Sequence, residues 1–434
     1  MRRRFALLAL LALIVSVLAA SCGGDDEEPA AGDTATAEEG GGVSGSLSIM
    51  GVWVGPEQES FQAVIDGFTE QNPDVEVNYN PAGDELPTVL STAVEGGNPP
   101  DIAAPAQPGF VQGLVDDGAL KPIDFAQETI QENLGDSGVA VGTFNDQLYG
   151  LFFKAGNKST IWYNVHSYED AGVEPPETWD EFIENGETLK ASGIPAYSIG
   201  GADGWTLTDL FENIYIRTAG PEMYDQLAKH EIPWTDQSVK DALTEMAKVF
   251  ADKDNIAGNP LQVDFETSVS QVFSESPEAA QVIEGAFVPG VVDHPLEAGT
   301  DFDVFEFPSV NDSGPAVVAD GNMFVMFNDT PAAQAFIEYA ASPEAAEIWA
   351  QRGGFASPNQ NIDTSVYPDE LTQRTAGPIA EAEVLRWDLS DLVPPEFGAT
   401  TGQGLWKLFQ DFVANPDDVD GIAQKMEQAA SAGS

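Results

Sequence analysis

SLSIMGVWVGPEQESFQAVIDGFTEQNPDVEVNYN, residues 46–80, contains a strand, a helix and a second strand in succession. The apolar run at 46–54 and the alternating run at 75–80 both predict strands. Between them, 59–73 predicts a helix, because its large apolar residues are spaced three, one and three apart: Phe61, Val64, Ile65 and Phe68. This order is typical of a parallel sheet covered by helices.

The same alternation continues along the chain and then starts again. It covers 85–97, 101–106 and 110–118. The chain leaves this first unit near 151–158, and the alternation resumes at 160 with a strand and further helices. Helices are also predicted at 178–193, 238–253, 331–342, 344–354 and 417–431. The sequence therefore predicts an α/β protein with two units of similar kind.

The composition is strongly acidic. The chain has 72 Asp and Glu residues against 17 Lys and Arg, for a formal charge of −55. Such a surface repels nucleic acid and anionic lipid, and the few basic residues form no cluster for phosphate groups. We therefore expect no nucleic-acid partner. One hypothesis is that the protein works in salty surroundings, where counterions screen its self-repulsion.

The N-terminus has the order of an export signal. Three arginines at 2–4 precede an apolar run at 5–18, small residues follow, and Cys22 is the only cysteine. Residues 23–45 are polar and rich in Gly and acids, as expected of a flexible tether. This pattern resembles a bacterial lipoprotein, in which 1–21 are removed and Cys22 carries lipid. Ordinary secretion by cleavage near Ala20, leaving a free thiol, is the alternative.

Three loops are candidates for ligand binding, because ligands of open α/β sheets lie beyond the carboxyl ends of the strands. They are GVWVGPE (51–57), PAQPGF (105–110) and GGADGWTLTD (200–209). Each places an aromatic or amide side chain among glycines or prolines, where the backbone can approach a ligand. Trp205 is the most informative, since its loop has no apolar periodicity that would explain it as core.

An indole with carboxylates and amides nearby suits a polyhydroxylated ligand. An aromatic face covers the apolar side of a sugar ring, while carboxylates and amides pair with its hydroxyl groups. The sequence offers Trp53 and Trp205 as aromatic candidates and, as polar candidates, Asp84, Gln107, Asp203 and Asp209.

Motifs for catalysis and metal binding are missing from the sequence. The three histidines are scattered, and there is no HExxH, no phosphate-binding loop and no GxSxG. PDDVDGIAQKME (416–427) resembles a calcium loop but has Pro416 at the first ligand position, so acidic capping of a helix is favoured. We expect no cofactor, no metal and no catalytic residue. A glycosidase needs only two carboxylates, however, and composition leaves that alternative open.

Several segments follow the lipoprotein start in a specific order along the chain: NPDVEV, GGNPPDIA (96–103), AQPG, ETWDEF, GWTLTDLFENIYIRTAGPEMYD (204–225), IEGAF, PAAQAFIEYAASPEAAEIWAQRGGFASPN (331–359) and RWDLSDLVPPEFG (386–398). Together they resemble extracellular solute-binding proteins of ABC importers, in particular the carbohydrate-binding group that includes maltose and α-glucoside binders. The resemblance covers nearly all of 46–430.

This resemblance implies two lobes joined by three chain crossings, with the ligand between them. Mapped onto this sequence, lobe 1 is 44–153 plus 303–352, and lobe 2 is 154–302 plus 353–434. It implies ligand contacts from lobe 1 by Trp53, Asp84 and Gln107. From lobe 2 it implies contacts by Trp205, Asp209, Phe287 and Trp406, with Gly353 and Gly354 near a crossing.

The implied function is capture of a sugar, such as an α-glucoside, by closure of the lobes and its delivery to a membrane permease. The expected protein is a monomer, lies outside the cell membrane and is held there by the lipid on Cys22. A binder of another uncharged polyol or osmolyte glycoside, a glycan-cleaving surface enzyme and an adhesive lipoprotein are the alternatives.

Overall fold

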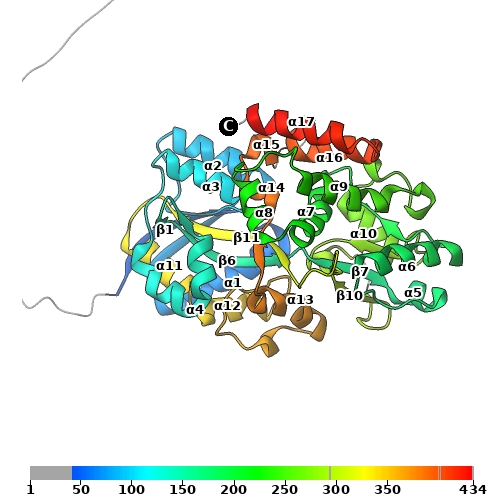
Figure 1. Cartoon of the computed structure of the whole chain (residues 1–434). Coiled ribbons are helices and arrows are strands. Elements are labelled where there is room, and N and C mark those ends of the chain that lie inside the picture. Colours follow the sequence, from blue (N-terminus) through cyan, green and yellow to red (C-terminus); the bar gives the residue numbers. More distant parts are fainter. Residues whose placement is uncertain (1–41, 293–294, 399, 401, 433–434) are drawn as a thin grey trace, which may run out of the picture. The chain divides into compact units, whose positions relative to one another are not determined.

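The computed structural model describes residues 42–432, except 293, 294, 399 and 401 (Figure 1). The predicted signal at 1–21, Cys22 and nearly all of the tether lie outside the described residues. Within the described ranges, no helix has the length and apolar character needed to cross a membrane.

The first sheet confirms the strand, helix, strand prediction for 46–80. β1 pairs in parallel with β2 and with β3, while β11 runs antiparallel to β3 and β6 and parallel to β12. The order is β12-β11-β3-β1-β2, with β6 also on β11. The strands are β1 (Ser44–Gly51), β2 (Asp74–Pro81), β3 (Ile102–Ala104), β6 (Gly150–Asn157), β11 (Val317–Met326) and β12 (Leu385–Trp387).

Helices cover both faces of this sheet (Figure 1). The predicted stripe of α1 is buried, with its four apolar side chains at most 3% exposed. Because the stripe packs on the sheet, this helix fixes the position of the loop that precedes it. The helices are α1 (Gly55–Gln71), α2 (Leu86–Glu95), α3 (Pro108–Asp116), α4 (Gln127–Val141), α11 (Pro331–Ala340) and α12 (Pro343–Ala350). A two-stranded hairpin, β4 (Thr143–Phe144) and β5 (Gln147–Leu148), follows α4.

The second sheet has four strands in the order β10-β7-β9-β8. They are β7 (Thr160–Asn164), β8 (Tyr197–Ser198), β9 (Gln281–Ile283) and β10 (Phe302–Glu306). Thr178 caps α6 in a reciprocal pair with Glu181, which explains why a helix starts there. The accompanying helices are α5 (Val165–Ala171), α6 (Trp179–Ser192), α7 (Trp205–Ala219), α8 (Pro221–Ala228), α9 (Gln237–Phe250), α10 (Phe265–Phe273), α16 (Gly404–Ala414) and α17 (Val419–Ala432).

Short elements complete the described chain. Three further helices lie between α12 and α16 in the sequence: α13 (Glu370–Glu381), α14 (Leu389–Leu392) and α15 (Pro395–Gly398). The 3-10 turns are η1 (Gly83–Glu85), η2 (Asp124–Ala126), η3 (Lys253–Asn255), η4 (Pro260–Gln262), η5 (Val288–Val291) and η6 (Thr364–Val366).

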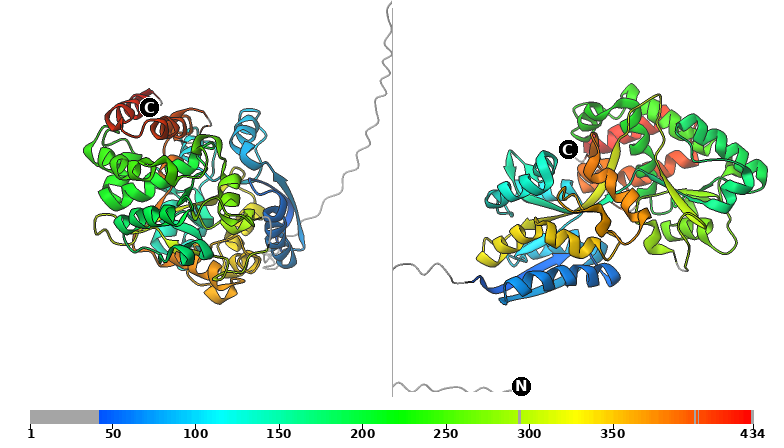
Figure 2. Two further views of the ribbon diagram at one scale, coloured as in Figure 1. Left: turned by 90° about the vertical axis from the view of Figure 1, so that its right-hand side faces the viewer. Right: turned by 90° about the horizontal axis from the view of Figure 1, so that it is seen from below.

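Two large hydrophobic clusters, one on each sheet, define two lobes (Figure 2). The chain passes between them three times: at 158–159 after β6, between β10 and β11, and at Asp388 between β12 and α14. The structure therefore has the α/β fold with two lobes and three crossings that the resemblance implied.

The lobe boundaries differ from the expected ones at two crossings. β10 pairs with β7 in the second sheet, so 303–306 belong to lobe 2 and not to lobe 1. Phe355, Ala356 and Trp387 pack in the first cluster, so the third crossing lies near 388 and not near 353. The physical reason is that strand pairing and burial across the sheet fix these segments, and neither is visible in local periodicity.

Candidate functional site

A cavity with a volume of about 750 Å³ lies between the lobes. Lobe 1 contributes Val52, Glu57, Ala106 and Arg352, and lobe 2 contributes Phe287 and Pro289. Its floor comes from the strands that reach the crossings, with Gly156 on β6 and Asp320 to Asn322 on β11. Residues 353–356 and several residues of α13 also line it. This volume is within the ~300–1,000 Å³ typical of small-molecule sites.

The predicted aromatics of lobe 2 come together beside this cavity. The ring of Trp205 lies 5.9 Å from that of Phe287, which lines the cavity, and 5.3 Å from that of Phe265. Gly204, at φ +89°, allows the chain to enter α7 here, and a Cβ at this position would lie 2.7 Å from the Cβ of Trp406. Trp205, Phe287 and Trp406 are all partly exposed, but only Phe287 is among the described residues that line the cavity.

Asp209 lies one helical turn after Trp205 on α7, and its side chain is buried. Its Oδ1 accepts a hydrogen bond from Lys158 Nζ at 3.0 Å, while Oδ2 has no described hydrogen-bond partner. Burial raises the pKa of Asp209 to about 8, against the opposing effect of Lys158. This side chain is therefore held in a strongly desolvated setting, and it is not among the described residues that line the cavity.

Lys158 is the centre of a buried cluster of charges at the crossings. Its Nζ also donates to Asp388 Oδ2 at 2.5 Å and lies 5.3 Å from the centre of the Trp205 ring. Burial alone would lower the pKa of Lys158, but the carboxylates of Asp209 and Asp388 raise it well above its usual value. Burial also opposes ionisation of Asp388, yet Lys158 keeps the pKa of that carboxyl below its usual value.

Two further acids, Asp320 and Asp391, line the cavity and were not predicted. Burial raises the pKa of both, and each also lies within the field of Lys158. A signal for Asp320 exists in the sequence, because it interrupts the apolar strand VVADGNMFVM. Asp391 falls in the segment RWDLSDLVPPEFG, which carried the resemblance, but its local pattern did not distinguish it from a helix cap.

The structure places Trp53 in the core of lobe 1, which corrects the expectation that it lines the cleft. Its side chain is 0% exposed, its Nε1 donates to Asn322 Oδ1 at 3.1 Å, and its ring packs against Phe61 and Trp349. Neighbouring Val52 lines the cavity instead. The side chain at 53 points inward because successive residues of an extended segment alternate between faces.

The remaining predicted polar residues have varied surroundings. Gln107 precedes α3 and is half-buried, and its neighbour Ala106 lines the cavity. Asp84 belongs to η1, but its side chain lies outside the described part of the structure. Asp203 accepts a hydrogen bond from Phe265 N at 2.7 Å, so it braces the loop that carries Trp205. Gly353 and Gly354 line the cavity, with φ values of +80° and +62°.

Among the described residues, the carboxylates of Asp209, Glu212 and Asp388 lie close enough together to hold a metal ion. These groups are already engaged, however. Lys158 binds two of them, and the two oxygens of Glu212 accept from the backbone N–H groups of Leu389 and Ser390. The ammonium of Lys158 thus supplies the positive charge that a metal ion would bring to this cluster.

The segment resembling a calcium loop acts as a helix start. Asp418 Oδ1 accepts from Gly421 N at 3.2 Å, the expected capping contact. The carboxylate of Glu427 faces away to His230 and to the backbone N–H of Trp234.

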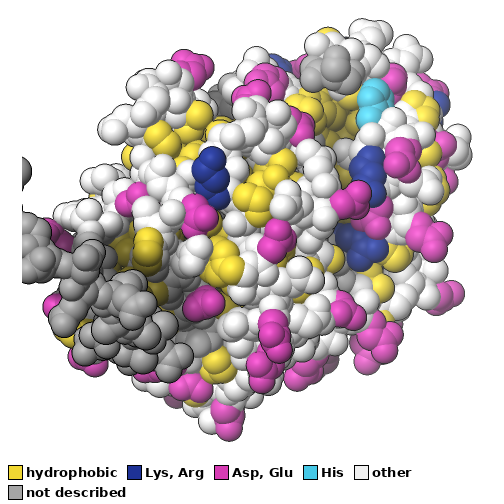
Figure 3. Space-filling model, turned by 90° about the vertical axis from the view of Figure 1, so that its left-hand side faces the viewer, with side chains coloured by type: hydrophobic (Ala, Val, Ile, Leu, Met, Phe, Trp, Pro, Cys, Tyr) yellow, Lys and Arg dark blue, Asp and Glu magenta, His cyan; other side chains and the backbone are white. Residues whose placement is uncertain are grey.

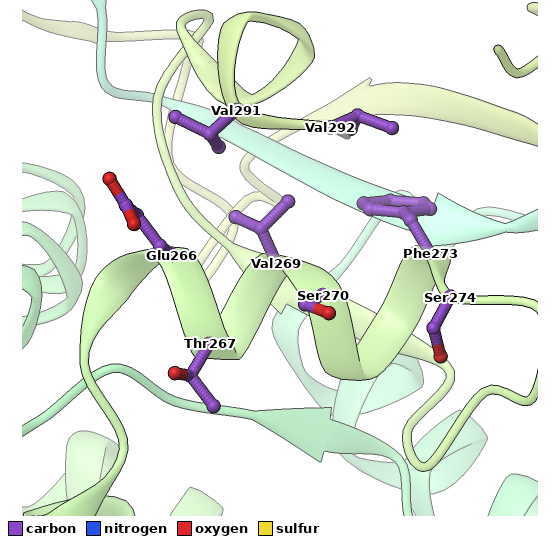
Figure 4. Close-up of a pocket in the computed structure, with 8 residues that line it drawn as sticks. All are labelled: Glu266, Thr267, Val269, Ser270, Phe273, Ser274, Val291 and Val292. Atoms are coloured by element: carbon purple, nitrogen blue, oxygen red, sulfur yellow. The ribbon is translucent and has the colours of Figure 1, made fainter. Parts of the chain in front are cut away.

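A second and smaller cavity of about 260 Å³ lies in lobe 2 between α10 and η5 (Figure 4). Val269 and Phe273 of α10 point toward Val291 and Val292, while Ser270 and Ser274 lie at its edge. Its lining mixes apolar side chains with Glu266, Thr267 and the two serines, whereas the cleft between the lobes combines aromatic and charged groups.

Comparison with known proteins agrees with this architecture. Residues 54–347 match the family model described as bacterial extracellular solute-binding protein. The chain belongs to this family. Its members are receptors for solutes rather than enzymes, and the family is extracellular, so this chain is a solute receptor located outside the cytoplasm.

Two relatives align with most of this chain. It is 32% identical over 401 residues to the osmoprotective compounds-binding protein GgtB of Synechocystis sp., covering 88% of this chain and 93% of the relative. It is also 32% identical over 403 residues to the alpha-glucosides-binding periplasmic protein AglE of Rhizobium meliloti, covering 88% and 86%.

Solved structures of low identity share the fold. The bacterial solute receptor AcbH has a TM-score of 0.78 at 17% identity, covering 90% of this chain and 99% of that chain. RafE of Streptococcus pneumoniae has a TM-score of 0.74 at 16% identity, covering 91% and 99%.

Proposed function

We propose that this chain is the substrate-binding lipoprotein of an ABC importer, and that it captures a neutral carbohydrate, an α-glucoside or a related oligosaccharide, between its lobes. The observation that carries this proposal is the cavity of about 750 Å³ that combines Phe287 with the carboxylates of Asp320 and Asp391. An aromatic face covers the apolar side of a sugar ring, and carboxylates are strong acceptors for hydroxyl groups.

Charge supports a neutral ligand. The acids near the floor are Asp209, Asp320, Asp388 and Asp391, with Lys158 as their buried counter-ion. Burial raises the pKa of Asp209, Asp320 and Asp391, so further negative charge is unfavourable beside these acids. Two basic residues, Lys154 and Arg352, line another part of the cavity, and Lys154 is paired with Glu57. A sugar phosphate or a uronic acid would add negative charge, whereas a neutral glycoside would not. The outer surface is likewise dominated by acids over bases, as one face illustrates (Figure 3).

We further propose that Trp205, Asp209, Phe287 and Trp406 contact the ligand from lobe 2, and Gln107 and Asp84 from lobe 1. Ligand contacts to both walls form together only when the lobes close, so binding shifts the population toward the closed form. The closed form then docks on the permease subunits. The protein acts as a monomer, and the lipid on Cys22 keeps it near the permease while 23–45 act as the tether.

The relatives differ in the ligand class that their names give, osmoprotective compounds for one and alpha-glucosides for the other. A second candidate ligand is therefore an osmolyte glycoside rather than a nutrient oligosaccharide. Trehalose, a neutral α-glucoside that serves as an osmolyte, belongs to both classes and is the first ligand to test.

The test is a thermal-shift screen followed by calorimetry with trehalose, maltose and sucrose, and with glucose 6-phosphate and glucuronate as anionic controls. A ligand that binds only the folded protein raises the melting temperature. We expect at least one neutral glycoside to raise it and both anions to leave it unchanged. Binding of the anions alone would refute the proposal. Chromatography of the incubated glycosides checks for hydrolysis, and released monosaccharide would contradict a receptor role.

A further inference from the structure

One helix, α7, contacts all three crossings between the lobes through polar side chains. Nearly all of α7 is buried, yet four of its polar residues are spaced three, one and four apart, which places them on one side of the helix. They are Asp209, Glu212, Asn213 and Arg217. A buried polar stripe of this kind is costly unless each group is paired.

The stripe is paired with backbone from segments far apart in the sequence. At the first crossing, Asn213 Nδ2 donates to Lys158 O at 2.9 Å and its Oδ1 accepts from Ser159 Oγ. At the second, Arg217 Nη2 donates to Ala316 O at 2.7 Å. At the third, Glu212 accepts from Leu389 N at 2.8 Å and from Ser390 N at 3.0 Å.

Lys158 adds the charged link in this arrangement. It lies on the first crossing, and its ammonium joins Asp209 of α7 to Asp388 of the third crossing. The acids whose charge it faces come from every element packed around it: Asp209 and Glu212 of α7, Glu284 after β9, Asp320 of β11, Asp388, and Asp391 of α14. Lys158 does not line the cavity between the lobes among the described residues.

We propose that Lys158 is a positioning residue for ligand capture, whose ammonium ties α7 to the third crossing and so sets both the orientation of Asp209 and Trp205 and the angle between the lobes. The role in capture rests on the proposed function, whereas the role at the crossings does not. Because Lys158 acts through Asp209, Asp388 and the Trp205 ring, its removal weakens binding without loss of a ligand contact.

The experiment uses the full chain with Cys22→Ser, which removes the only cysteine. Thr88→Cys on α2 and Glu184→Cys on α6 then add one exposed labelling site in each lobe, and paired spin labels report the distance between them. Three changes are compared: Lys158→Met, Lys158→Arg and the double variant Lys158→Met/Asp388→Asn. The matched control is Lys190→Met, because Lys190 is also held by two carboxylates, Glu187 and Asp252, but on the surface of lobe 2.

Lys158→Met leaves both Asp209 and Asp388 buried without their shared cation, so we expect a large drop in melting temperature. If this variant fails to fold, the double variant carries the test. Asn at 388 keeps Oδ1 as the acceptor for Ser390, so the double variant should recover most of the melting temperature. It should still bind the glycoside at least ten-fold more weakly than the parent and show a broader distance distribution without ligand.

A purely structural role predicts instead that the double variant recovers stability, affinity and distance together, and that outcome would overturn the proposal. Lys158→Arg keeps the charge and should restore part of the affinity, whereas Lys190→Met should leave affinity and distance unchanged. If the parent protein binds no neutral glycoside, the proposed function fails, while the ligand-free distances still decide whether Lys158 sets the lobe angle.

Discussion

Phe287→Ala removes an aromatic that lines the cleft and is the most direct test of how the sugar is held. The Phe287 ring is half-buried and packs against Trp205 at 5.9 Å and Phe265 at 5.4 Å, which leaves part of it for a ligand. An aromatic side chain buries ~150–250 Å² in all, so one free face amounts to about 80 Å². At ~25 cal/mol per Å², covering that face contributes about 2 kcal/mol, or roughly a 30-fold change in Kd.

The assay is calorimetric titration of the neutral glycoside identified in the screen, with unfolding by urea measured in parallel. Phe305→Ala is the matched control, because Phe305 is also half-buried and also has two ring neighbours, Tyr163 at 5.6 Å and Tyr168 at 6.4 Å, but it does not line the cavity. Both variants should lose stability, by about 1–3 kcal/mol. Only Phe287→Ala should raise Kd. Equal Kd values for the two variants would refute the assignment of the cleft as the sugar site.

Three further outcomes are expected. Trp205→Ala should weaken binding by ~1–3 kcal/mol through loss of apolar contact, and an unchanged affinity by calorimetry would remove Trp205 from the site. Asp209→Asn should gain stability relative to the parent as pH rises. The parent's Asp209 pKa is about 8 in the folded state against an ordinary value near 4, so its ionisation opposes folding increasingly between these pH values, by up to ~1.4 kcal/mol per pH unit. Urea unfolding of both proteins from pH 5 to pH 8 measures this, and a stability difference that is constant with pH would contradict the assignment. Cys22→Ser should abolish partition into detergent while leaving sugar binding intact, and continued partition would mean that the protein is anchored elsewhere.

Local periodicity was sufficient to predict the α/β class and several of its elements, whereas the two lobes were expected only from the family resemblance. The spacing of Phe61, Val64, Ile65 and Phe68 identifies one buried helical face, and the observed α1 buries all four. The runs on either side have the burial expected of strands and pair in parallel. Amphipathic spacing and strand alternation depend only on which side of an element faces the core, so neighbouring residues suffice to read them.

Only part of the candidate site could be predicted from the sequence. The glycine-rich loop at 200–209 drew attention to Trp205, whose ring packs against Phe287, a residue that lines the cleft. The same reasoning failed for Trp53, because a loop that follows a strand can turn a large side chain either into the cleft or into the core. Asp391 was missed because, among 72 acids, nothing local distinguishes it from a helix cap, whereas Asp320 was missed although it interrupts an apolar strand.

The sequence by itself determined the α/β class, the order of strands and helices, the acidity and the absence of familiar catalytic motifs. Tertiary structure alone decided that Lys158, Asp209 and Asp388 share one buried cluster at the crossings. Asp209 lies 51 positions and Asp388 lies 230 positions after Lys158 in the sequence. Their proximity follows from how two sheets and one polar helix pack. The desolvation that shifts their pKa values exists only once that packing has excluded water.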